Sequence, residues 1–228
     1  MGPEVNEPHR RAPRSRAYDK QRRREAAEES RMRVLAQSRE LFLAGGYGRT
    51  TIAAIARAAG VSKESVYKGF GGKPGLVRAI YEQSLLGAGG APAEERSDRA
   101  QTSVTDAREL MEQFGRFTAE VSPLGAPVFL LIRDAAASGD PDMAALLRDV
   151  EDARYSRMLH NARQVRARGF LRKALTEAEV ADVMFACTSA ELYEGLVVRR
   201  GWSAEHYGNF IARTLGANLL PGSSAIGS

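Results

Sequence analysis

The sequence predicts an all-α protein with a three-helix N-terminal helix-turn-helix domain and a larger helical C-terminal domain. Apolar residues recur at helical spacing along most of the chain, and no stretch alternates convincingly as a strand. Glycine and proline residues fall at the ends of these periodic segments, where helices stop and start. With 228 residues, of which 43% are hydrophobic, the chain can bury a core in one small and one larger domain.

Charge is unevenly distributed between the two predicted domains. Residues 1–86 hold 17 Lys and Arg against 9 Asp and Glu, whereas residues 87–228 hold 16 against 19. The positive excess near the N-terminus favours a nucleic-acid partner, because basic side chains neutralise phosphates. The single cysteine, Cys187, fits a reducing compartment, and no apolar run reaches the length of a membrane span. We therefore expect a soluble, cytoplasmic protein without a membrane partner.

Residues 1–29 are interpreted as a basic, largely disordered arm. They are rich in arginine, and the first part is also rich in proline and has little that is apolar. Two roles stay open for this arm: its arginines could enter the minor groove of DNA, or it could be a solvated tail. The first helix is expected to start between Tyr18 and Arg31 and to end at Ala44.

The stretch from Thr50 to Lys73 predicts two short helices joined by a tight turn. Thr51 and Ser62 are suitable N-caps for the two helices. A small residue at Ala56 lets the helices approach and Gly60 makes the turn. An apolar residue six positions later then locks the pair. This spacing is typical of a helix-turn-helix, although a simple helical hairpin of an all-α protein shares the glycine turn.

The residues around this turn resemble the DNA-binding domain of the TetR family of bacterial repressors. The resemblance covers about residues 30–86, with the motifs in order at the right separations. The segment around the end of the first helix matches the family at Leu41, Phe42, Gly46 and Tyr47. The helix-turn-helix matches follow: Thr51, Ile55, Ala56, Ala59, Gly60, Val61, Ser62, Tyr67, Phe70 and Lys73.

The resemblance implies which residues face DNA. Thr51, Tyr67 and Lys73 match positions that contact phosphates in the family. Lys63, Glu64, Ser65 and Lys68 are candidates for base edges, because Lys pairs with guanine and Glu with cytosine. The full expected set is Thr50, Thr51, Ser62, Lys63, Glu64, Ser65, Tyr67, Lys68 and Lys73.

One position departs from the family pattern. Gly69 stands where the family usually has His or Tyr, and Gly71 and Gly72 follow it. A phosphate contact is therefore missing, and we expect the recognition helix to fray early.

The remaining elements are predicted from the helical spacing of apolar residues and from the proline and glycine residues that interrupt it. A connecting helix over 74–86 begins near Pro74, and residues 87–100 read as a flexible loop between the domains. Five further helices are expected within the ligand-binding and dimerisation domain at 101–221. They cover 102–121, a segment opened by Pro123 or Pro127, 140–169, 176–201 and 203–219.

The last two helices, about 176–220, carry apolar residues on more than one face. The resemblance implies that they pair with a second copy as a four-helix bundle, which gives a homodimer that binds a palindromic DNA operator. It also implies a ligand-responsive repressor that is released by a small effector. The scarcity of charge along the helices of the C-terminal domain indicates a mainly apolar or aromatic effector, whose structure the sequence does not identify. Large residues that could line the effector pocket are Phe114, Phe117, Phe129, Tyr155, Met158, Phe185 and Tyr193.

Other functions receive less support from the sequence. The three histidines have no metal-binding or catalytic-base spacing, so we expect no enzyme activity, no metal and no cofactor. Cys187 reads as a core residue. The main alternative is a non-specific architectural DNA-binding protein that uses the basic arm. It predicts steep salt dependence with little sequence preference. A helix-turn-helix that docks on another protein is the third alternative, and it predicts no DNA affinity.

Overall fold

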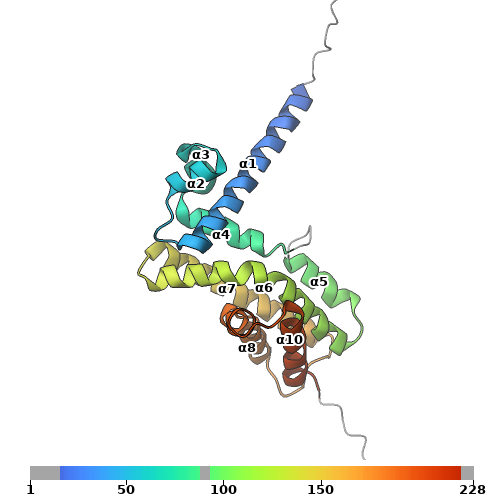
Figure 1. Cartoon of the computed structure of the whole chain (residues 1–228). Coiled ribbons are helices and arrows are strands. Elements are labelled where there is room, and N and C mark those ends of the chain that lie inside the picture. Colours follow the sequence, from blue (N-terminus) through green and yellow to red (C-terminus); the bar gives the residue numbers. More distant parts are fainter. Residues whose placement is uncertain (1–15, 88–92, 222–228) are drawn as a thin grey trace, which may run out of the picture.

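The computed structural model describes residues 16–87 and 93–221, and every regular element in these ranges is helical. Figure 1 shows the N-terminal helices as a head above a body made by the C-terminal helices. The elements are α1 (Arg16–Gly45), α2 (Ile52–Ala59), α3 (Lys63–Phe70), α4 (Lys73–Ser84), α5 (Ala93–Ser103), α6 (Ala107–Ala137), α7 (Pro141–Ala167), α8 (Glu177–Cys187), α9 (Ala190–Tyr193), the π-helix η1 (Glu194–Arg199) and α10 (Ala204–Leu219). The predicted all-α class is confirmed.

The head is a small bundle in which α1 packs against α2 and α4. Its core consists of side chains that the helical spacing places inward. Ile55 of α2, Val66 of α3 and Leu76 of α4 are all fully buried. Phe42 near the end of α1 is also buried and stacks on Tyr47, with ring centroids 5.9 Å apart. The motif residues therefore serve first as the core that fixes α2 and α3 in place.

The first helix starts earlier than the sequence predicts. α1 begins at Arg16, so the second half of the expected disordered arm at 1–29 is helical, and residues 1–15 lie outside the described residues. Side chains described between 20 and 29 are exposed. This part of α1 has no apolar face to reveal it, whereas Glu, Gln, Arg and Ala all favour helix and continue the turn already formed downstream.

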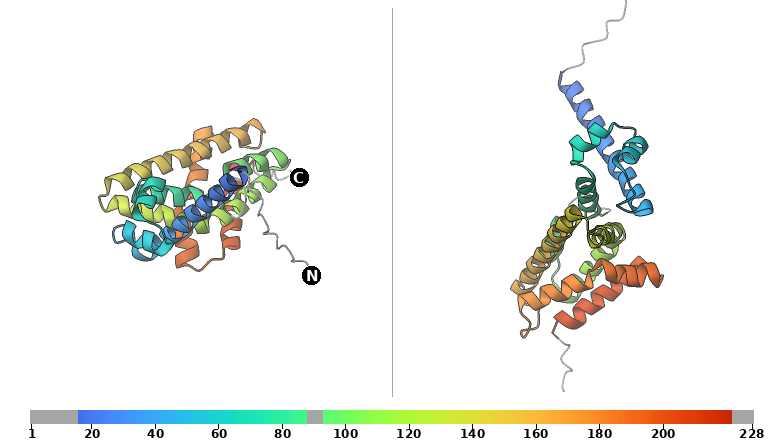
Figure 2. Two further views of the ribbon diagram at one scale, coloured as in Figure 1. Left: turned by 90° about the horizontal axis from the view of Figure 1, so that it is seen from above. Right: turned by 90° about the vertical axis from the view of Figure 1, so that its left-hand side faces the viewer.

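The connecting helix α4 runs from the head to the body (Figures 1 and 2). It contacts α1 and α3 on one side and α6 and α7 on the other. Ile80 and Tyr81 are buried, and Arg78 forms an ion pair with Asp149 of α7. A shift of the body helices would therefore reach the head through α4.

The body packs α6 against α7 and α10, with α8 against α7. The sequence predicts a new helix at Pro123 or Pro127, but both prolines lie inside the single helix α6. Each proline removes one N–H donor to the carbonyl four residues earlier. Packing overrides that loss, because Val128, Phe129 and Ile132 beyond the prolines are buried in the same core as Leu110 before them.

The expected loop at 87–100 is corrected from Ala93 onward, where α5 begins, and residues 88–92 of that loop lie outside the described residues. The side chains of this segment are held by α7. Arg157 donates to the Asp98 carboxylate at 2.6 Å, and Gln101 donates from Nε2 to Oδ1 of Asn161 at 3.0 Å. These partners lie about 60 positions away, so local periodicity could not indicate the helix.

The single helix expected over 176–201 is divided into α8, α9 and η1. The break falls at Thr188 and Ser189, whose hydroxyls bond the backbone. Thr188 donates to the Met184 carbonyl at 2.9 Å, and Ser189 accepts from the Leu192 N–H at 3.2 Å as a new N-cap. Such side-chain hydrogen bonds compete with the backbone hydrogen bonds that would continue the helix. Thr176 and Glu179 form a capping box at the start of α8, and Ser203 caps α10.

None of the helices within 16–87 and 93–221 is long and apolar enough to cross a membrane.

Candidate DNA-binding surface and effector cavity

The turn between α2 and α3 has the local geometry that the sequence predicts. Thr51 accepts from the Ala54 N–H, and Ser62 accepts from the Ser65 N–H, both at 3.1 Å. Gly60 adopts the left-handed conformation with φ of 68°, and the next N–H, that of Val61, returns to the Ala56 carbonyl at 3.0 Å. These bonds close both helix ends and set α3 at a fixed angle to α2.

The outer face of α3 is available to a partner. Tyr67 is 56% exposed, and the remaining side chains of this face are exposed as well: Lys63, Glu64, Ser65 and Lys68. The hydroxyls of Ser62 and Ser65 lie 3.0 Å apart. Hydrogen bonds from the backbone and from Ser62, with Lys63 nearby, lower the pKa of Glu64, so this carboxylate is ionised at neutral pH. The face therefore presents cations, one anion, hydroxyls and a phenol on a rigid helix.

Two of the expected DNA-binding residues have other contacts in the structure. Thr50 is buried, and its hydroxyl donates to the Gly46 carbonyl at 2.8 Å at the end of α1. Lys73 is half-buried, with Nζ 4.2 Å from the centroid of the Tyr47 ring. A buried hydroxyl of this kind stabilises the α1–α2 junction. The Lys73 ammonium makes a cation–π contact near the start of α4.

The recognition helix does not fray at its glycines. α3 extends to Phe70, and Gly71 ends it with an N–H bond to the Tyr67 carbonyl at 2.8 Å. The neighbouring Gly75 is required by close approach, because a Cβ there would lie 1.7 Å from the Phe70 carbonyl oxygen. The end of α3 thus rests directly on the first turn of α4.

One basic residue near this surface was not predicted. Arg31 of α1 places its guanidinium 4.8 Å from the centroid of the Phe70 ring and is exposed. The contact joins residues 39 positions apart, so no local spacing could have indicated it.

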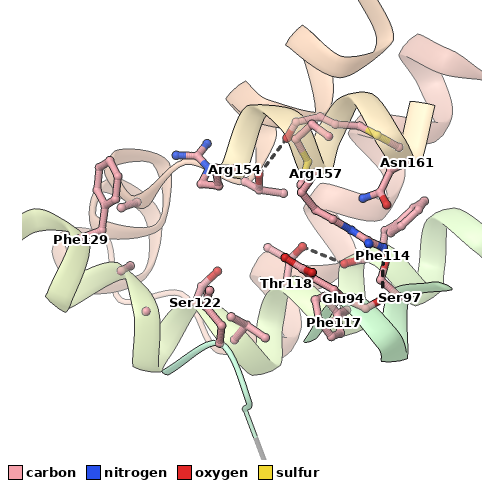
Figure 3. A pocket seen from close by; sticks show the side chains of 18 of the residues that line it. Glu94, Ser97, Phe114, Phe117, Thr118, Ser122, Phe129, Arg154, Arg157 and Asn161 are labelled. Carbon is pink, nitrogen blue, oxygen red and sulfur yellow. Dashed lines mark hydrogen bonds between the residues drawn. The ribbon is translucent and has the colours of Figure 1, made fainter. Parts of the chain in front are cut away.

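The body contains a cavity of about 210 Å³ that is lined mainly by residues of α4, α5, α6 and α7, with further lining residues from α8, α9 and α10 (Figure 3). Four of the seven expected pocket residues line it: Phe114, Phe117, Phe129 and Met158. Tyr81 and Leu85 of the connecting helix also line it, so the cavity touches the element that leads to the head.

Three expected pocket residues lie elsewhere. Tyr155 and Phe185 pack edge to face with centroids 5.9 Å apart, and Tyr193 packs in the same way on Tyr207 at 5.5 Å. None of the three lines the cavity. These three side chains pack between helices, although they belong to the same kind of periodic segment as the cavity residues. Only the tertiary arrangement distinguishes the residues that line the cavity from those that do not.

The polar lining of the cavity was missed from the sequence. Arg154, Arg157 and Asn161 project from α7, and Thr118 and Ser122 project from α6 (Figure 3). The spacing of 154, 157 and 161 is that of one helix face, which is a signal that a search restricted to aromatic residues overlooks. Arg157 is neutralised by Asp98, and hydrogen bonds from Arg157 lower the pKa of that carboxylate.

Cys187 is 9% exposed, and burial raises the pKa of its thiol, in agreement with a core residue. In the described part of the chain, no group of three or more His, Cys, Asp or Glu side chains is placed to hold a metal ion.

Several solved structures share this fold. A putative transcriptional regulator from Saccharomonospora viridis in complex with choline aligns with a TM-score of 0.63 and 21% identity, covering 85% of this chain and 99% of that one. The SmeT–triclosan complex aligns with a TM-score of 0.67 and 20% identity, covering 86% of this chain and 93% of that one. NalD of Pseudomonas aeruginosa is the secondary repressor of the MexAB-OprM multidrug efflux pump. It aligns with a TM-score of 0.67 and 17% identity, covering 87% of this chain and 100% of that one. At these identities the likeness establishes the fold.

No curated protein sequence matches the chain significantly. The sequence of the head does match a family: residues 34–80 correspond to the bacterial regulatory proteins of the tetR family. This range contains the turn at Gly60, the exposed face of α3 and most of α4. Residues 34–80 therefore carry the N-terminal domain of the bacterial regulatory proteins of the tetR family, and the chain as a whole shares the fold of the solved structures above.

Proposed function

We propose that this protein is a sequence-specific DNA-binding repressor that acts as a homodimer on a palindromic operator. The observation that carries the proposal is the exposed outer face of α3, held rigidly by the caps at Thr51 and Ser62 and by the turn at Gly60. A helix presented in this way fits the major groove, where Lys, Glu and Ser side chains read base edges.

Contacts to phosphates would orient this helix. Tyr67 lies on the exposed face, and Thr51 places the N-terminus of α2 at the surface, where its free N–H groups favour an anion. Lys73 can reach a phosphate from its position against Tyr47. These three groups fix the register of α3 on the duplex without selecting a sequence.

Dimerisation is proposed through the last two helical segments, about 176–220. Val198 at the end of η1 is 64% exposed, and half-buried apolar side chains accompany it: Leu192, Leu196, Val197, Trp202 and Phe210. An isologous pair would bury these residues and relate two heads by a two-fold axis. Two recognition helices then match half-sites about one helical turn, roughly 34 Å, apart.

Release by an effector is proposed to begin in the cavity. Its lining joins body helices to Tyr81 and Leu85 of α4, and α4 in turn contacts α3. A ligand that binds better when α4 is tilted away from the DNA-binding arrangement shifts the population toward that state. Triclosan in SmeT and choline in the Saccharomonospora protein are small molecules bound by proteins of the same fold.

The proposal is tested by selecting bound sequences from random duplexes at about 150 mM salt, which is near physiological ionic strength. We expect an inverted repeat to be enriched by the full chain and lost in the Tyr67→Ala, Lys68→Ala double variant. The exposed Arg148→Ala substitution on α7 serves as the matched control for removing a cation. Binding without any enriched motif would favour the architectural alternative, and no binding would exclude both DNA-binding functions.

A further inference from the structure

We infer that the cavity takes an effector with an anionic group, a carboxylate or an anion of similar geometry, on an apolar body, and that Arg154 receives this group. The inference rests on the proposed effector role of the cavity and names the chemical class of its ligand. It depends on how the charges of the cavity are compensated.

Arg154 is a half-buried cation that has no ion pair among the described residues. Its Nη2 donates to the Phe185 carbonyl at 2.6 Å, and its Nε is buried without a hydrogen-bond partner. Among the described residues, no carboxylate lies within ion-pair distance of this guanidinium. Removal from water lowers its pKa, which reflects the cost of holding the charge there.

Nearby groups compensate this charge only in part. The guanidinium carbon lies 3.8 Å from the centroid of the Phe185 ring and 5.7 Å from that of Phe129, so two aromatic rings flank it. Glu191 is close enough to interact electrostatically but is paired with Arg133 at 3.0 Å. An anion in the cavity would supply the charge-assisted hydrogen bonds that the protein itself leaves unmade.

The charge of the other cation in the cavity is already compensated by the protein. Arg157 is held by Asp98 at 2.6 Å and donates to the Glu94 backbone carbonyl at 3.2 Å. Figure 3 shows Glu94 beside Phe117, away from Arg154 and Phe129. The cavity therefore has one cation without a carboxylate partner near Phe129 and one exposed carboxylate, that of Glu94, beside Phe117, with aromatic and aliphatic surface over most of the remaining wall.

The position of Arg154 also connects the anion to the head. Tyr81 of α4 lines the same cavity as Arg154. An anion bound at this guanidinium would lie near the connecting helix, where its differential binding to two arrangements of α4 can be transmitted.

The test compares three probes with the same ten-carbon chain and different headgroups: decanoate, decanol and decyltrimethylammonium. Binding to the full-length protein is measured by titration calorimetry without DNA. We expect decanoate to bind roughly tenfold or more tighter than decanol, as a charged hydrogen bond provides, and decyltrimethylammonium to bind weakest. No binding of decanoate, or equal or tighter binding of either other probe, would overturn the inference.

The Arg154→Met variant keeps much of the apolar stem of the side chain and removes the charge. It should lower decanoate affinity to that of decanol and leave decanol affinity unchanged. Arg148→Met, an exposed residue on the same helix, is the matched control and should change neither affinity. If Arg154→Met retains full decanoate affinity, the anion does not bind at Arg154. If that variant fails to fold, the headgroup series on the wild type still decides.

Failure of this inference is distinguishable from failure of the proposed function. A protein that binds its selected duplex but shows no headgroup preference retains the regulator function and loses the anionic effector. A protein that prefers decanoate but binds no duplex retains the anion site and loses the proposed function.

Discussion

Arg78 of α4 donates to Asp149 of α7, with Nη2 and Oδ2 2.6 Å apart, and so ties the connecting helix to the body. Both side chains are about half exposed, at 46% and 57%. A double-mutant cycle with Arg78→Ala and Asp149→Ala, followed by chemical unfolding, should give a coupling free energy of about 0.2–1 kcal/mol because exposed pairs are screened by water. The coupling should fall at high salt, and one that salt leaves unchanged would contradict this account of the pair.

Two glycines at the end of α3 should respond to alanine in opposite ways. Gly69 lies inside the helix, and a Cβ added there would have no other atom within 4 Å, so Gly69→Ala should raise the free energy of unfolding by about 0.5–1 kcal/mol. Gly75→Ala places a Cβ against the Phe70 carbonyl and should destabilise the head enough to abolish operator binding. Thermal unfolding and DNA binding of both variants check this. A Gly75→Ala variant with wild-type operator affinity would refute the close contact.

The pairing of Asp98 with Arg157 predicts a stability difference that depends on pH. Because the pKa of Asp98 is lowered in the folded state, its stabilising contribution is present above the ordinary pKa of 3.8. That contribution is lost as pH falls through the lowered, folded-state pKa. Wild type should therefore have a higher melting temperature than Asp98→Asn at neutral pH, and the difference should shrink as the solution is acidified below the ordinary pKa. A constant difference over that range would show that the carboxylate charge plays no part.

The local elements of this fold were readable from the sequence, and the long-range ones were not. The caps at Thr51 and Ser62 and the turn at Gly60 depend on neighbouring residues, so their pattern predicts them directly. Helix α5 depends on partners in α7, and the continuity of α6 through Pro123 depends on packing against α10.

The two candidate sites differ in the same way. The exposed face of α3 is one short segment, and its residues follow from helical spacing alone. The cavity is assembled from helices far apart in the chain, so aromatic periodicity identified Phe114 and Phe129 but could not separate them from Tyr155. Helical spacing places Arg154 on one face with Arg157, but only the tertiary structure distinguishes the arginine that has a carboxylate partner from the one that has none.

Lys73 and Lys68 should differ in their effects on DNA binding. Lys73→Gln removes a proposed phosphate contact. It should lower the affinity for the operator and for random duplexes by similar factors. It should also reduce the slope of log affinity against log salt by about 1. Lys68→Gln removes a proposed base contact. It should weaken the binding free energy for the operator by about 1–3 kcal/mol and leave that for random duplexes nearly unchanged. Fluorescence anisotropy over a salt series measures both, with Arg148→Gln as a control that should leave the slope unchanged.

The central claim is that the outer face of α3 reads base edges, and Glu64 offers its most direct test. Its ionised carboxylate is suited to accept from cytosine N4. Selection from random duplexes should be repeated with Glu64→Gln beside the wild type. The account predicts that base preference changes at one position, and at the symmetry-related position of the other half-site. An unchanged motif, or a change confined to overall affinity, would contradict base reading by this face.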